Sequence, residues 1–342
     1  MRKSGPTLAC FSEFDDLHFE TATFGELLTH LMDTSGIRRI VRNIIRPLKP
    51  WQRIPTMLHP NELRNLHDRA KEVKGAGLIA DLGTWLGGST GALAAGISAN
   101  DSPATAKVKV HAYDLFLVDD FSKEQKLIPE IQLLNIGDSF LPTFLKHMAP
   151  WKDRVEAHQG DLTQQQWVGG PIELMHVDIM KNWDLTNHVS IAFYPHLIPG
   201  RSIIIHQDFA HYWTGWIHLH LYRLRNYLEP VQHVPHTSSF VFRLKTAIPA
   251  EALNRKVSPD DLDPTEVAAA FEWSRSIMPK DAVQRFTIDA AEAMLCYHLG
   301  EKARCAALTK KATEAETEFK RQYPDHIGRS ELRLVQRFVD KG

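Results

Sequence analysis

The sequence is poor in the features that define several protein classes. Its 342 residues include only three cysteines, Cys10, Cys296 and Cys305, too few and too scattered for a disulfide framework or a zinc site. Basic and acidic residues nearly balance, at 40 and 41, so no basic field attracts a polyanion. No run of about 18 apolar residues occurs, and the N-terminus lacks the apolar stretch of a secretory signal. We therefore expect a soluble cytoplasmic protein without nucleic-acid or membrane partners.

The central part of the chain alternates short apolar runs with helical patterns. We expect strands at 77–81, 107–113, 154–158, 172–177 and 202–206, and helices near 59–74, 89–99, 138–149, 184–196 and 213–228. Such alternation is typical of a parallel sheet covered by helices on both faces. Two further strand patterns, 230–234 and 238–244, are joined by a turn too short for a helical crossover, so this last pair should be antiparallel.

The remaining sequence is predicted to be helical. Residues 1–56 mix short helical patterns with a basic, proline-punctuated piece that we interpret as a cap segment. Residues 57–248 form the α/β domain, and residues 249–342 carry amphipathic helical patterns. This C-terminal appendage is expected to make homo-oligomer contacts or to form a wall of the substrate pocket.

The stretch LIADLGTWLGGSTG, residues 78–91, joins the first strand to its helix. Its glycines, at 83, 87, 88 and 91, do not have the G-x-G-x-x-G spacing of a dinucleotide site. Glycine also serves any tight strand-to-helix turn, so a purely structural turn is the alternative interpretation. The position favours ligand binding, because open α/β sheets bind ligands at the carboxyl ends of their strands.

The same stretch resembles motif I of class I S-adenosylmethionine (SAM)-dependent methyltransferases: an apolar strand, an acid, an apolar residue, glycine, three residues and glycine. The resemblance implies that Gly83 and Gly87 let the backbone pass close to the methionine portion and ribose of SAM. It implies that Asp81 attracts the cationic ligand. Ser89 and Thr90 are expected to cap the helix and to hydrogen-bond the ligand carboxylate.

Two further acids follow the second and third strands. Asp114 occupies the position where the family places an acid that accepts the ribose hydroxyls, although an NAD ribose would use the same acid. Asp161 matches the position that meets the adenine amino group, and Leu162 is expected to pack on the ring. The full set of SAM contacts that we expect is Asp81, Gly83, Thr84, Gly87, Ser89, Asp114, Leu115, Asp161, Leu162 and Asp178.

The resemblance covers residues 57 to about 245 and includes the reversed last hairpin, with which class I methyltransferases characteristically end their sheet. It implies an α/β fold: a Rossmann-like seven-stranded methyltransferase sheet, parallel except for an antiparallel last strand and flanked by helices, with helical N- and C-terminal additions.

The fourth and fifth strands should supply the catalytic residues. Those expected there are Asp178, Lys181, His206, Asp208 and His211. Methyl transfer is an in-line displacement, so the enzyme must align the reactants and remove a proton from the acceptor. His206 or His211 is the candidate base, with Asp178 or Asp208 orienting its imidazole.

This region is similar to the macrocin O-methyltransferase group, which modifies hydroxyls of sugars and other natural products. In that group an acid after strand four and an Asp-Asp pair after strand five can hold Mg²⁺. The corresponding residues here are Asp178, Gln207 and Asp208, so an amide replaces one carboxylate and the requirement for Mg²⁺ stays open.

The predicted function is SAM-dependent methylation of a hydroxyl of a small molecule in natural-product biosynthesis. A nucleic-acid amine methyltransferase would carry an Asn/Asp-Pro-Pro-aromatic motif after strand four, where Asp178 is instead followed by Ile-Met-Lys. The alternatives are an NAD-dependent oxidoreductase and a SAM-binding scaffold without turnover. His176 is interpreted as a hydrogen-bonded core histidine, and Tyr212 and Trp213 either pack in the interior or line an aromatic pocket.

Overall fold

The computed structural model describes residues 48–124, 129–324 and 330–341. Most of the predicted N-terminal cap segment, together with Cys10, lies outside these residues. Within them, no helix is long and apolar enough to cross a membrane.

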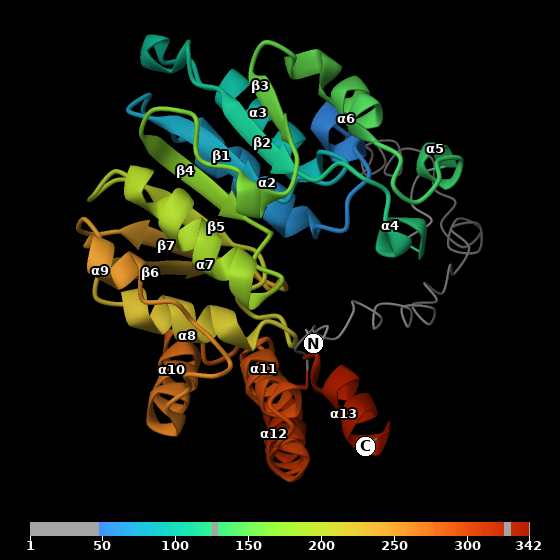
Figure 1. Ribbon diagram of the computed structural model, residues 1–342, viewed down its shortest axis with the longest axis vertical. Coiled ribbons are helices and arrows are strands. Elements are labelled where there is room, and N and C mark those ends of the chain that lie inside the picture. Colours follow the sequence, from blue (N-terminus) through green and yellow to red (C-terminus); the bar gives the residue numbers. More distant parts are fainter. Residues whose placement is uncertain (1–47, 125–128, 325–329, 342) are drawn as a thin grey trace, which may run out of the picture.

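Seven strands form one sheet (Figure 1), in the order β3-β2-β1-β4-β5-β7-β6. Strands β1 to β5 pair in parallel, whereas β7 lies between β5 and β6 and is antiparallel to both. The strands are β1 Leu78–Leu82, β2 Val110–Asp114, β3 Val155–Gln159, β4 Ile172–Val177, β5 Ile203–His206, β6 Leu228–His233 and β7 Phe240–Leu244. The predicted Rossmann-like methyltransferase sheet, with its antiparallel last strand, is therefore confirmed.

Alternation along the strands divides the core between the two faces of the sheet. Ile79, Leu174 and Ile205 belong to one buried cluster, which also contains Leu66 and Leu93 from the helices on that face. Residues of the other face, among them Met175 and Ile204, pack with side chains of the helices and loops opposite. Since successive side chains of a strand point to opposite faces, the apolar runs of the sequence supply both clusters.

The first face is covered by α2 and α3, and the second by α7 and α8. The helices of the α/β region are α2 Pro60–Lys71, α3 Gly88–Ser98, α4 Asp120–Glu124, α5 Pro129–Gln132, α6 Leu141–Met148, α7 Trp183–Ala192, α8 Gly215–Leu224 and α9 Ala250–Leu253. The 3₁₀ turns are η1 Pro50–Arg53, η2 Pro103–Thr105, η3 Ala149–Trp151, η4 Leu162–Gln164 and η5 Tyr194–His196.

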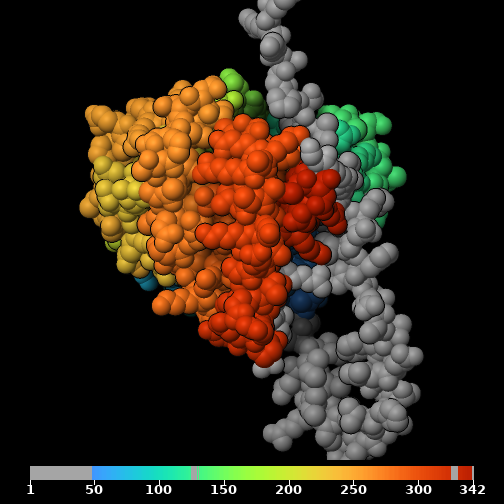
Figure 2. All heavy atoms as spheres, turned by 90° about the horizontal axis from the view of Figure 1, so that it is seen from below, coloured from blue at the N-terminus to red at the C-terminus, as the bar shows by residue number. Residues whose placement is uncertain are grey.

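The C-terminal helices predicted beyond Pro249 are present: α10 Pro264–Ile277, α11 Arg285–His298, α12 Lys302–Gln322 and α13 Leu332–Lys341. Figure 2 shows α10 to α13 side by side at one end of the molecule. Arg223 of α8 forms an ion pair with Glu266 of α10, at 2.8 Å, and Leu295 of α11 belongs to the same buried cluster as the sheet residues. The appendage is thus packed on α8 and shares the main core.

Candidate active site

A glycine elbow joins β1 to α3 at the carboxyl edge of the sheet. Gly83 and Gly87 have φ angles of 86° and 93°, and Trp85 between them has a φ of 43°, all in the left-handed region that favours glycine. A Cβ atom on Gly83 would lie 2.2 Å from the backbone oxygen of Asp178. Glycine is therefore required for the elbow to lie against the end of β4, in addition to any contact with a ligand.

Asp114 is fixed against this elbow. Its Oδ2 accepts a hydrogen bond from the Trp85 backbone N–H, and its Oδ1 accepts one from the Phe116 N–H, both at 2.8 Å. Burial raises the pKa of Asp114, although these backbone donors oppose the shift. Each carboxylate oxygen has a second lone pair, so Asp114 can still accept hydrogen bonds from two hydroxyls of a ligand.

The Asp81 side chain has no exposed surface in this structure, and the expected attraction between Asp81 and the cationic ligand stays a prediction. Ser89 and Thr90 donate their hydroxyls to its Oδ2 at 2.9 and 2.6 Å, and His176 Nδ1 donates to its Oδ1 at 2.8 Å. The two hydroxyls therefore hold Asp81 and do not cap α3, whose N-cap, Gly87, provides no side-chain hydrogen bond. Ligand contact by Ser89 or Thr90 stays a prediction.

His176 is a buried, hydrogen-bonded core histidine, as the sequence predicted, and its partner is Asp81. Burial lowers its pKa, but the hydrogen bond and the charge of Asp81 outweigh burial and raise the pKa above its ordinary value. The imidazole is therefore held next to a negative charge beneath the elbow, and this pair fixes β1 to β4.

Asp161 and Leu162, which follow β3, make contacts within the protein. Asp161 caps η4, since its Oδ1 accepts hydrogen bonds from the Thr163 N–H and hydroxyl at 2.9 and 2.8 Å. Leu162 is 6% exposed and packs in the core, whereas Leu115 is 47% exposed. Contacts of these residues with adenine stay predictions.

The elbow also contains polar atoms that fit a ligand. Thr84 Oγ1 and Trp85 Nε1 are buried and have no hydrogen-bond partner among the described residues. Buried polar groups in proteins are nearly always bonded, so each orphaned one needs an explanation, such as a catalytic role or a bound water or ion. Together with Asp114, these groups suit a ligand that carries hydroxyl and other polar groups, such as a nucleoside.

Lys181 bridges the carboxylates that follow β4 and β5. Its Nζ lies 2.6 Å from Asp178 Oδ1 and 2.5 Å from Asp208 Oδ2. Burial acts against the ammonium charge, but the two carboxylates raise the pKa of Lys181 above its usual value. Burial likewise opposes the charge of Asp208, but Lys181 and His211 bring its pKa below the ordinary range. The three side chains form a charged network at the carboxyl ends of β4 and β5, a region that we call the catalytic mouth.

This network bears directly on the predicted metal site. Asp178, Gln207 and Asp208 offer oxygen atoms of the kind that Mg²⁺ prefers, and the Gln207 Oε1 is buried without a partner among the described residues. However, the Lys181 ammonium already neutralises one oxygen of each carboxylate. As arranged, the residues therefore do not fit Mg²⁺, because a second cation would have to displace Lys181.

His206 does not lie at the mouth. It is 1% exposed, its Nε2 is paired with the Tyr194 hydroxyl at 2.8 Å, and its ring lies against Phe242. Burial lowers the pKa of His206 to about 3. This burial and the low pKa do not favour catalysis by His206, whose role as a base stays a prediction.

His211 is the histidine that lies at the mouth. It is only partly buried, and its Nδ1 accepts a hydrogen bond from the Trp213 N–H at 3.3 Å, a long bond that constrains the proton position weakly. Burial raises the pKa of Glu331, and the interaction with His211 opposes this shift; His211 also helps to lower the pKa of Asp208. The imidazole is thus flanked by two carboxylates.

Two acids near the site were missed by sequence reasoning. Glu331, just before α13, accepts a hydrogen bond from the Tyr212 N–H at 2.7 Å, so the C-terminal appendage contributes a carboxylate to the mouth. Glu62 of α2 accepts hydrogen bonds from the Ser239 hydroxyl and the His59 N–H at 2.6 and 2.7 Å. Burial raises the pKa of Glu62 to about 7. The spacing His59-x-x-Glu62 is that of a capping box, which could have revealed Glu62; no comparable signal precedes Glu331.

Trp213 packs against the appendage. Its ring lies 4.5 Å from that of His298 and 5.8 Å from that of Phe338, so it joins the loop before α8 to α11 and α13. The Tyr212 ring lies beside that of His211 in a tilted arrangement, with ring centroids 4.9 Å apart. Of these two aromatic residues, Tyr212 is therefore the one beside the mouth.

No family model matches the chain, and no curated protein matches it. Among solved structures, the chain is similar to an O-methyltransferase, TomG, from Streptomyces achromogenes, at 12% identity and a TM-score of 0.40, covering 62% of this chain and 96% of that one. A TDP-rhamnose 3'-O-methyltransferase of calicheamicin biosynthesis aligns at 15% identity and a TM-score of 0.39, over 64% of this chain and 90% of that one. An O-methyltransferase from Bacillus cereus aligns at 16% identity and a TM-score of 0.37, over 60% of this chain and 96% of that one.

Proposed function

We propose that the protein is a SAM-dependent methyltransferase that modifies a hydroxyl of a small molecule. The observation that carries the proposal is the meeting of three elements at the elbow. Gly83 passes against the backbone of Asp178, and Trp85 binds the carboxylate of Asp114. Asp114, which would accept the ribose hydroxyls, and Asp178, an acid of the catalytic mouth, are therefore both held against the same turn.

Bound SAM would supply an electrophilic methyl group on a sulfonium. The acceptor oxygen would attack this methyl carbon as the carbon–sulfur bond breaks, so that S-adenosylhomocysteine would leave with the bonding electron pair. The hydroxyl proton must go to a base, and His211 is the best placed residue, because it is partly exposed and flanked by Asp208 and Glu331. These carboxylates would favour the imidazolium that forms.

Lys181 has a separate role in this proposal. As an ammonium it balances Asp178 and Asp208, so His211 and the acceptor meet a mouth whose negative charge is partly neutralised. We propose that Lys181 holds these carboxylates in place where related sites use Mg²⁺. No step of the proposed reaction requires a metal ion.

Glycine spacing separates this proposal from the oxidoreductase alternative. Asp114 would also bind an NAD ribose, but the elbow lacks the G-x-G-x-x-G pattern that places a pyrophosphate on a helix N-terminus. A sugar or another natural product is the acceptor class that we propose, because a polyhydroxylated molecule suits the polar mouth.

The experiment is transfer of a labelled methyl group from SAM to a panel of hydroxylated sugars, phenols and polyketides. We expect product with at least one member and a large loss of turnover in His211→Gln. His196→Gln is the matched control, because His196 is exposed and outside the mouth. Tight SAM binding without transfer to any acceptor would instead favour a scaffold.

A further inference from the structure

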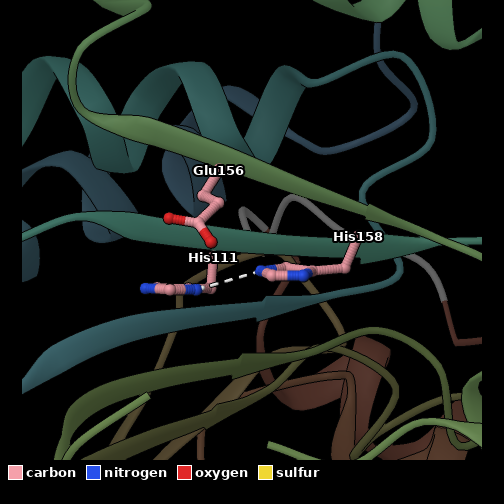
Figure 3. Close-up of side chains that lie close together, drawn as sticks. All are labelled: His111, Glu156 and His158. Atoms are coloured by element: carbon pink, nitrogen blue, oxygen red, sulfur yellow. Dashed lines mark hydrogen bonds between the residues drawn. The ribbon is translucent and has the colours of Figure 1, made fainter. Parts of the chain in front are cut away.

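Two neighbouring strands at one edge of the sheet bring together three side chains of metal-binding types. β2 and β3 pair in parallel, with His111 opposite Glu156 and Tyr113 opposite His158. Because alternate residues of a strand share a face, His111, Glu156 and His158 project from the same face (Figure 3). One ligand atom of each lies within 4.8 Å of those of the other two.

The two imidazoles are close to the spacing that one metal ion requires. His111 Nδ1 and His158 Nε2 lie 3.0 Å apart, and the planes of the two rings differ by only 8°. A tetrahedral zinc ion with bonds of about 2.0–2.1 Å to nitrogen would hold two ligand atoms ~3.4 Å apart. An ion could therefore replace the hydrogen bond between the rings with a shift of a few tenths of an ångström.

The surroundings keep both rings oriented and ready to bind. The Tyr113 ring stacks on that of His158 at 4.3 Å, and Trp167 lies 5.0 Å from His111. These ring contacts limit the rotation of both imidazoles, and the neutral imidazole is the form that ligates metals.

Glu156 is the adjustable ligand. Its side chain is 46% exposed and pairs with Lys109, itself 47% exposed, at 3.4 Å. Such exposed pairs stabilise proteins by at most about 1 kcal/mol, so Lys109 does not prevent Glu156 from turning toward the rings. Because Glu156 is exposed to solvent, water can supply the fourth ligand.

We propose that His111, Glu156 and His158 bind a divalent transition metal ion of the zinc class, with water completing a tetrahedron. Two imidazoles and one carboxylate are a ligand set that zinc commonly takes. The ion would join the edge strand β3 to β2, just before the strand ends that carry Asp114 and Asp161. This site is separate from the catalytic mouth and does not depend on the proposed methyltransferase activity.

The test is calorimetric titration of the chelator-treated full chain with Zn²⁺, together with the visible spectrum of the Co²⁺ form. We expect one tight site, a Co²⁺ spectrum of nitrogen and oxygen ligands, and a higher thermal unfolding midpoint with Zn²⁺. His158→Ala and Glu156→Gln should each weaken binding by more than about 10-fold, since even outer-shell partners of metal sites contribute 10–100-fold.

Two controls keep this test decisive. His196→Ala removes an exposed histidine outside the cluster and should leave Zn²⁺ affinity unchanged. Glu156→Gln changes an exposed side chain, so it reports on binding even if His158→Ala fails to fold. Wild-type affinity in Glu156→Gln and in folded His158→Ala would overturn the proposal, as would a Co²⁺ spectrum with thiolate absorption, which would place the ion on cysteine.

Discussion

Replacing Lys181 by methionine tests whether its charge holds the catalytic mouth together. The ammonium contacts two carboxylates at 2.6 and 2.5 Å, and the side chains of Asp178 and Asp208 are only 22% and 6% exposed. Two unit charges about 4 Å apart interact by ~4 kcal/mol at an effective dielectric constant of 20. Because Lys181 itself is 47% exposed, solvent screening and side-chain entropy reduce this value. We expect Lys181→Met to lower the free energy of unfolding by about 1–3 kcal/mol.

Differential scanning calorimetry can measure this loss as a fall in Tm of roughly 2–10 °C. Lys152→Met is the matched control, because Lys152 is exposed and has no ion pair among the described residues; its Tm should stay near that of the wild type. Adding Asp208→Asn to Lys181→Met removes one of the two uncompensated charges and should restore part of the stability. If the double variant is no more stable than Lys181→Met, charge compensation is not what Lys181 provides.

The other predictions concern metal dependence, acid stability and the appendage. Turnover should survive EDTA and should not rise on adding Mg²⁺, because Lys181 already neutralises the carboxylates; a strict Mg²⁺ requirement in activity assays would refute that role. Burial lowers the pKa values of His206, His218 and His220 to about 3, 3 and 4, respectively. The stability that these neutral histidines contribute is fully present above pH 6.5 and is lost as the pH falls from 6.5 towards the lowered pKa values. At pH 5 this loss is ~2 kcal/mol per histidine, and denaturant titrations at pH 7.5 and 5 should differ accordingly; equal unfolding free energies would contradict it. Glu331→Gln should lower turnover without changing SAM affinity. Unchanged kinetics would show that the appendage does not contribute to catalysis at the mouth.

The sheet could be predicted from the sequence because its determinants are local. Apolar runs such as 172–177 are bounded by turn residues, and the short turn before Phe240 permits only antiparallel pairing with β6. Asp114 could be located by the same reasoning, since a strand end fixes where its side chain lies. The structure adds that both of its oxygens are already bonded to the elbow.

The hydrogen-bond partners of Asp81 and His206 could not be predicted in this way. Each residue depends on partners from other elements: Asp81 on Ser89, Thr90 and His176, and His206 on Tyr194. Strand alternation places His206 on the same face as Ile204, which the second helical layer buries. Glu331 reaches the mouth from 119 residues away in the sequence, a contact that no local pattern encodes.

The most direct test of the proposed function is calorimetric titration of the wild type and of Asp114→Ala with SAM, and with NADH for comparison. The proposed site predicts that the wild type binds one SAM and does not bind NADH. Asp114→Ala should lose SAM binding, because the ribose hydroxyls lose both carboxylate acceptors. Binding of NADH but not SAM by the wild type, or unchanged SAM affinity in Asp114→Ala, would contradict the assignment of the elbow.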